Sequence, residues 1–134
     1  MTFSRTTEYA LRVLSFIAHG EKEYYSSAHL HARLKIPKKY LQRLLTKLSK
    51  KGLIKSVRGK HGGYALARPT GKIFIADIIE AVEGFQKVPS CFFGYEKCTP
   101  GNPCSMHEVW SAAQNKMIKA LSSTPLTLLV AKKR

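Results

Sequence analysis

Acidic residues are scarce in this sequence, and they are unevenly placed. The chain of 134 residues has 8 Asp and Glu against 23 Lys and Arg, which gives a formal net charge of +15. Residues 24–76 contain no acid at all. A solvated surface normally mixes charges of both signs, so a long stretch of one sign indicates a polyanionic partner rather than a basic protein kept soluble by its charge.

Long apolar runs and targeting motifs are also lacking. No stretch is long enough to span a bilayer and no lipidation motif is present, so a membrane is a poor candidate for the polyanion. No apolar segment follows a basic start at the first residues, so we expect no signal peptide and a cytoplasmic location. Cysteine occurs only three times, an odd number, which argues against a disulfide framework in that compartment.

Patterns typical of catalysis are missing as well. The chain shows no paired carboxylates suited to acid–base chemistry, no glycine loop after a strand to cradle a phosphate, and no nucleophile beside a base. Gly59, Gly62 and Gly63 are better explained as a turn between two short strands. We therefore predict a protein that is not an enzyme, with a length that suits one domain and a modest core.

The pattern that is present predicts a winged helix-turn-helix in residues 1–83. Ser4 or Thr6 can cap a first helix that ends near Gly20. A second helix is expected over residues 28–34, and a third from Pro37 to about residue 51. Two short strands over 53–57 and 64–67 then form the wing, and a short helix follows over 73–82. The fold class is thus mainly α with a small β-hairpin.

The third helix and the wing carry the densest positive charge. Residues 37–60 contain nine Lys and Arg and no acid. Lys and Arg neutralise phosphates and can also reach guanine in the major groove, while Gln can reach adenine. The candidate contacts to double-stranded DNA are Lys38, Lys39, Gln42, Arg43, Lys47 and Lys50 in the helix, and Arg58, Lys60 and His61 in the wing.

A loop over residues 84–104 holds all three cysteines. Their spacing is Cys91-x6-Cys98-x5-Cys104-x2-His107, which collects three thiolates and one imidazole. Four such ligands suit either a tetrahedral zinc ion or an iron–sulfur cluster, and the spacing does not choose between them. Two alternatives remain open: regulation through the bare thiols, and a DNA-binding protein without a sensor.

A last helix over residues 105–122 has a seam of apolar residues spaced by four and three. Such a seam is typical of a helix that packs on a partner helix, and a winged helix leaves it little of its own domain to cover it. We therefore expect residues 105–134 to form a dimerisation helix and a short frayed tail, the tail covering residues 124–134. The seam residues are Met106, Trp110, Ala113, Met117 and Ala120.

Four segments of the chain resemble one known family, the Rrf2 family of bacterial winged-helix regulators. They are residues 7–12, 36–41, 52–56 and 58–68, of which the wing segment is the most specific, and the likeness covers nearly the whole chain. The resemblance implies a homodimer crossed through the long last helix. It also implies binding to palindromic promoter sites.

The same resemblance bears on the cysteine loop. Residues 104–110 are similar to the iron–sulfur regulators of the family, in which the matching His completes a [2Fe–2S] site. Redox-sensing and nitric-oxide-sensing relatives instead use an acidic residue near the N-terminus of the other subunit, and Glu8 occupies that kind of position. The resemblance thus implies a [2Fe–2S] or [4Fe–4S] cluster held by Cys91, Cys98 and Cys104 with His107 or Glu8. The first cysteine spacing, six rather than five residues, departs from the family pattern.

Overall fold

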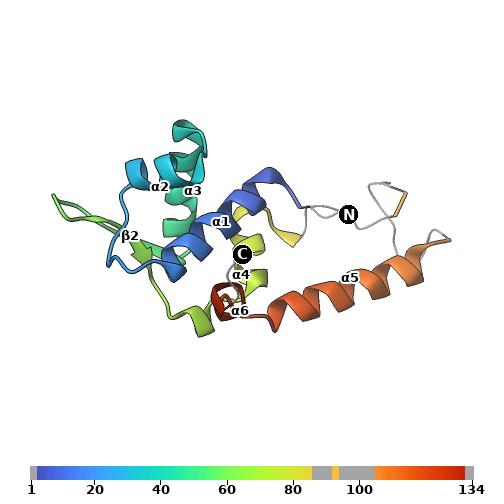
Figure 1. Ribbon diagram of the computed structural model, residues 1–134. Helices are drawn as coiled ribbons and strands as arrows, with labels where there is room; N and C mark the ends of the chain where they lie inside the picture. Colours follow the sequence, from blue (N-terminus) through green and yellow to red (C-terminus); the bar gives the residue numbers. More distant parts are fainter. Residues whose placement is uncertain (1–2, 86–91, 94–104, 132–134) are drawn as a thin grey trace.

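The computed structural model describes residues 3–85, 92–93 and 105–131, which form helices and one two-stranded antiparallel sheet (Figure 1). This confirms the expected mainly helical class with a small hairpin. The elements in chain order are α1 (Arg5–His19), α2 (Ser27–Leu34), α3 (Lys38–Lys50), β1 (Ile54–Val57), β2 (Gly63–Leu66), the 3-10 turn η1 (Thr70–Lys72), α4 (Ile75–Val82), α5 (His107–Ser122) and α6 (Thr127–Ala131).

Local sequence signals explain where the first three helices begin and end. The Ser4 side chain caps α1 and the Ser26 side chain caps α2, where Ser26 Oγ accepts a hydrogen bond from His29 N at 3.1 Å. Helix α3 ends at a glycine with φ +75°, Gly52, whose N–H donates to Ser49 O at 3.1 Å. This positive φ is favourable only for glycine, so Gly52 stops the helix and turns the chain into β1. Pro37 precedes α3 as its cap rather than standing as its first residue.

The core lies where α1, α3 and α4 meet. On α3 the apolar residues expected to face inward are almost completely buried, and α4 packs against both α1 and α3. Burial of this stripe leaves the remaining positions of α3 on the outside of the molecule. The buried α3 residues are Leu41, Leu44, Leu45 and Leu48.

The wing is braced by the linker that joins α1 to α2. Strand β1 pairs with β2 in register from Ile54 opposite Leu66 to Val57 opposite Gly63. Tyr25 of the linker adds a bridge on the outer side of β2, because its N–H donates to Tyr64 O at 2.9 Å and its carbonyl accepts from Tyr64 N at 2.7 Å. The wing therefore has a fixed position relative to the start of α2.

Gly63 is the position at which this brace is most sensitive to substitution. Its φ is +146°, and a Cβ atom there would lie 2.5 Å from Tyr25 O. We expect Gly63→Val to break the bridge and to lower the free energy of unfolding by about 1–3 kcal/mol from backbone strain alone. Thermal unfolding measures this, with Gly71→Ala as the control because its Cβ would meet nothing closer than Thr127 Oγ1 at 3.8 Å. Equal melting temperatures for the two variants would contradict the prediction.

The C-terminal region differs in part from the expectation. Helix α5 projects away from the body of the molecule, and none of its residues is buried (Figure 1). The expectation of a frayed tail was wrong, since Leu126 is fully buried and its N–H donates to Ile73 O at 2.7 Å. The tail folds back because Leu126 completes the core beside the start of α4, and α6 contacts α1.

Within the described residues, no helix is long and apolar enough to cross a membrane.

Candidate nucleic-acid interface and metal ligands

All six predicted DNA contacts of α3 are exposed to solvent, and most of them lie on its outer face. Lys38, Lys39, Gln42, Arg43, Lys47 and Lys50 are all exposed. Because the helix turns once every 3.6 residues, Lys39, Arg43 and Lys50 fall in one row along this face. Three cations in a row on an exposed helix match the repeating phosphates and base edges of a major groove.

Thr46 belongs to the same row, and the sequence interpretation missed it. It is exposed and lies three residues after Arg43 and four before Lys50, a spacing that could have revealed it. Its hydroxyl donates to Gln42 O at 2.9 Å. A contact from Thr46 to a base would therefore come from its methyl group, which suits the methyl group of thymine.

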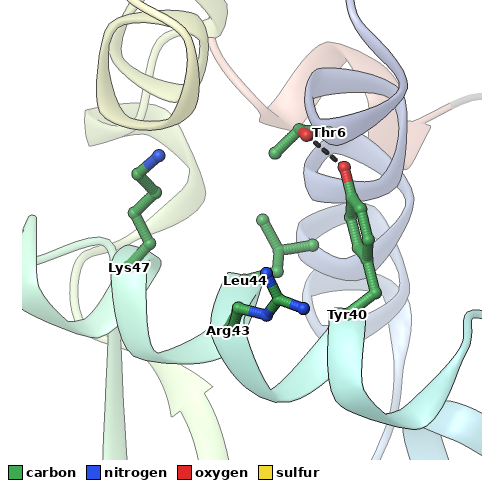
Figure 2. Close-up of a pocket in the computed structure, with 5 residues that line it drawn as sticks. All are labelled: Thr6, Tyr40, Arg43, Leu44 and Lys47. Carbon is green, nitrogen blue, oxygen red and sulfur yellow. Dashed lines mark hydrogen bonds between the residues drawn. The ribbon is translucent and has the colours of Figure 1, made fainter.

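Two side chains hold α3 against its neighbours, as Figure 2 shows. The Tyr40 hydroxyl forms a hydrogen bond with Thr6 Oγ1 of α1, and the Tyr40 ring packs edge-on against Tyr9 with centroids 5.3 Å apart. Lys47 Nζ donates to Val82 O at 3.2 Å, at the last residue of α4. A cation is favourable at the carbonyl end of a helix, so Lys47 has a structural role in addition to its predicted DNA contact.

These contacts border a shallow hollow of about 190 Å³. Arg43 lines it together with Thr6, Tyr40, Leu44 and Lys47. Figure 2 shows Tyr40 pointing toward α1, with Arg43 between Tyr40 and Lys47 on the rim of the hollow. By helical spacing, Arg43 also belongs to the exposed row with Lys39 and Lys50. The hollow thus marks the edge between the anchored flank and the exposed row.

The wing turn carries the remaining predicted contacts. Arg58, Lys60 and His61 are exposed, and Gly62 N donates to Gly59 O at 3.1 Å to close the turn. Strand β1 packs against α3, so the hairpin and α3 form one unit. We call the exposed face of α3 and this turn the basic surface.

The structure describes only two of the five predicted metal ligands. Cys91, Cys98 and Cys104 lie outside the described residues. His107 is half-buried as the first residue of α5, and Glu8 is exposed in the first turn of α1. Within the described part of the chain, no three His, Cys, Asp or Glu residues are grouped to hold a metal ion.

Aromatic residues next to the predicted ligands pack on the start of α5, which the sequence interpretation did not foresee. Phe92 follows Cys91 directly, and its ring lies 5.5 Å from that of Trp110 and 5.8 Å from that of Phe93. Trp110 is one helical turn beyond His107. Phe92 is thus brought to the first turn of α5, the turn that begins at His107.

The end of α4 is tied to the first turn of α1. Glu83 Oε2 accepts hydrogen bonds from Thr7 Oγ1 at 2.7 Å and from Ser4 N at 3.3 Å. Thr7 is fully buried, so its hydroxyl depends on this carboxylate. The end of α4 therefore contacts both α1, through Glu83, and α3, through Lys47.

Comparisons with known proteins agree on one kind of protein. The model of the Rrf2 family, described as an iron-dependent transcriptional regulator, matches residues 3–132. The HTH-type transcriptional regulator IscR of Xenorhabdus nematophila is 34% identical over 131 residues, covering 97% of this chain and 79% of that protein.

Two solved structures extend this likeness to the fold. CymR, the global cysteine regulator of B. subtilis, matches with a TM-score of 0.81 and 28% identity over 100% of this chain and 99% of that one. T. potens IscR matches with a TM-score of 0.73 and 29% identity over 95% of this chain and 84% of that one. The relatives are regulators of transcription, so the prediction that the protein is not an enzyme is confirmed.

Proposed function

Since the chain belongs to the Rrf2 family of transcriptional regulators, we propose that it is a cytoplasmic homodimer whose affinity for promoter DNA is controlled by an iron–sulfur cluster in the cysteine loop. The observation that carries this proposal is the combination of the basic surface with three cysteines between α4 and α5. The basic surface supplies the contacts to DNA, and the cysteines supply the ligands of a sensor.

Exposure and charge support the role in DNA binding. Lys39, Arg43 and Lys50 are exposed and would contact phosphates and guanines, and Gln42 would contact adenine. The wing turn, led by Arg58, would enter the adjacent minor groove or bind the backbone. Phosphate contacts would set the register of the protein on the duplex, and base contacts would set its sequence preference.

The exposure of α5 supports a homodimer. Val109 is 64% exposed, and no residue of α5 is buried by the rest of the described chain. A second copy that crosses this helix would bury its apolar seam, which includes Trp110 and Met117. Two α3 helices related by a two-fold axis would read a roughly palindromic operator with half-sites one turn of DNA apart.

The donor set fits an iron–sulfur cluster. Cys91, Cys98 and Cys104 would supply thiolates, and His107 or the partner protomer's equivalent of Glu8 would supply the fourth ligand. When bound, such a cluster supplies a centre that can change its oxidation state or be lost. The IscR name of two relatives and the iron-dependent description of the family support this choice.

The contacts of α4 offer a route from the loop to the recognition helix. Residues 84–104 leave α4 directly after Glu83, which holds α1 through Thr7, and Lys47 holds α3 to the carbonyl of Val82. A shift of the α4 end would therefore move α1 and α3 as well. Half-sites at a fixed spacing tolerate little change in the separation of two recognition helices, so a small shift could change affinity.

A second candidate keeps the DNA-binding role but replaces the cluster with thiol or zinc chemistry. The structural likeness to Staphylococcus aureus CymR, which has been solved in an oxidized form, favours it. Three cysteines and a histidine would serve that chemistry equally well. A DNA-binding protein without any sensor is the remaining alternative from the sequence, and it would leave the cysteines without a role.

Salt dependence of binding tests the proposed role on DNA. A labelled duplex, selected by repeated rounds of binding, is titrated with the protein while fluorescence anisotropy is recorded. If two protomers make six to ten phosphate contacts, affinity should fall by about 10³–10⁵-fold between 50 and 200 mM salt. An affinity that hardly changes over this range would rule out binding through the basic surface.

A further inference from the structure

A second hollow lies on the other side of the wing turn, between that turn and the linker before α2. Its volume is about 360 Å³, and residues from both segments line it. The lining includes two lysines and two histidines, and it contains no carboxylate. We call it the linker hollow, and its basic residues are Lys22, His29, Lys60 and His61.

The chemistry of this lining suits an oxyanion. Lys22 and Lys60 each carry a positive charge and three N–H donors, and an imidazole offers at least one N–H donor in either protonation state. Ser26, which also lines the hollow, caps the N-terminus of α2, where the helix dipole favours negative charge. Glu21 and Glu23, the acids of the linker, are exposed and do not line the hollow.

The linker side of the hollow is held in place before any ligand arrives. The His29 ring packs against Tyr25, with centroids 5.5 Å apart, and against Phe16 at 6.0 Å. Tyr25 is only 4% exposed, its hydroxyl accepts from Lys22 N at 3.1 Å, and its backbone bridges Tyr64 of the wing. Because the linker is braced against the wing, an anion could bind there with little loss of side-chain entropy.

The position of the hollow indicates which anion it meets. Lys60 and His61 belong to the basic surface and also line the hollow, so the two regions are continuous. A volume of about 360 Å³ lies within the usual range of sites that bind small ligands, so a phosphate group can enter. If the wing tip enters a minor groove, one of the two DNA strands that border this groove would continue past this side of the wing.

We propose that the linker hollow binds a backbone phosphate of the DNA strand that flanks the site read by α3 and the wing tip. This inference rests on the proposed function, since it needs DNA on the basic surface. It extends the interface to Lys22 and His29, which lie outside the residues predicted from sequence. A free phosphate or a phosphorylated small molecule shares the same chemistry, and the test below separates the two sources.

The test compares a double variant with a matched control. Lys22→Ala with His29→Phe removes the two basic side chains of the linker side while keeping a ring against Tyr25 and Phe16. His19→Ala with Lys72→Ala removes one exposed His and one exposed Lys elsewhere. We expect the first variant to bind the selected duplex more weakly, with a salt slope smaller by about one per protomer. The control should keep the wild-type affinity and slope.

Further measurements keep the outcomes distinct. Lys22→Ala alone changes only an exposed side chain, so its smaller slope would support the proposal even if the double variant folded poorly. Inorganic phosphate is titrated into the free protein while the histidine ring resonances are followed, with chloride at equal ionic strength as the reference. Phosphate-specific shifts of His29 with unchanged DNA binding in the variants would overturn the DNA assignment in favour of a free anion.

If the variants matched the control on DNA and phosphate caused no specific shifts, the hollow would not be an anion site. If the proposed function itself were wrong, the result would differ. Wild type, variants and control would then all lack a DNA affinity that falls steeply with salt. Retained steep binding in the control together with an unchanged slope in the variants would overturn this inference alone.

Discussion

Replacing Lys39 and Arg43 together with Glu should abolish specific binding to DNA. Both side chains stand in the exposed row of α3, and a good contact to a base is worth about 1–3 kcal/mol. Charge reversal removes two such contacts and adds repulsion from the phosphates, so affinity for the selected duplex should fall by at least about 100-fold. Fluorescence anisotropy measures the loss directly.

The fold should survive this change, which makes the result interpretable. Glu has nearly the same helix propensity as Lys and Arg, and neither position contacts the core. Lys72→Glu with Lys116→Glu is the matched control, because it makes the same change in net charge at exposed positions outside α3. It should weaken binding only a few-fold through the long-range field. Equal losses in the two double variants would show that α3 is not the recognition helix.

Replacing Cys91, Cys98 and Cys104 with Ala should remove the visible colour, iron and sulfide from protein purified without oxygen. The three thiolates form most of the proposed ligand set, so the absorbance should fall to background rather than by a fraction. The buried core is built from residues 10–82 and Leu126, none of them cysteine, so the variant should still fold and bind DNA. Its DNA affinity should no longer respond to reconstitution with iron and sulfide.

Single variants then identify the fourth ligand. His107→Ala should change the spectrum if the imidazole is bound, and Glu8→Gln should change it if the carboxylate from the other protomer is bound. Glu108→Gln is the control, since Glu108 is an exposed acid beside His107. The wild-type protein purified without oxygen could instead be colourless and contain zinc or no metal. That result would overturn the proposal of an iron–sulfur cluster and favour the thiol or zinc alternative.

Local patterns in the sequence were sufficient for the recognition helix and the wing. The periodicity of Leu41, Leu44, Leu45 and Leu48 predicted both the helix and its buried side, and therefore the outward position of its cations. Gly52 predicted the end of that helix, and the glycines of the wing predicted its turn. These features are predictable because helical spacing and positive φ depend on residues close together in the chain.

Other features depend on partners far apart in the sequence. Thr7 and Glu83 are 76 residues apart, and Lys47 and Val82 are 35 apart, yet these pairs tie α4 to α1 and α3. The bridge between Tyr25 and Tyr64 likewise fixes the wing against the linker and creates the linker hollow. No periodic signal marks such contacts, because a hydrogen bond between distant residues leaves no repeat in the chain.

By itself, the sequence determined the class of the protein: its helices, its hairpin and its charged face. Those properties follow from composition and short-range spacing, which act before the chain is packed. Only the tertiary structure decided that the tail completes the core through Leu126, that Lys47 caps α4, and that His29 lies beside the wing. These depend on which buried surfaces meet, and that is settled when the core closes around α1, α3 and α4.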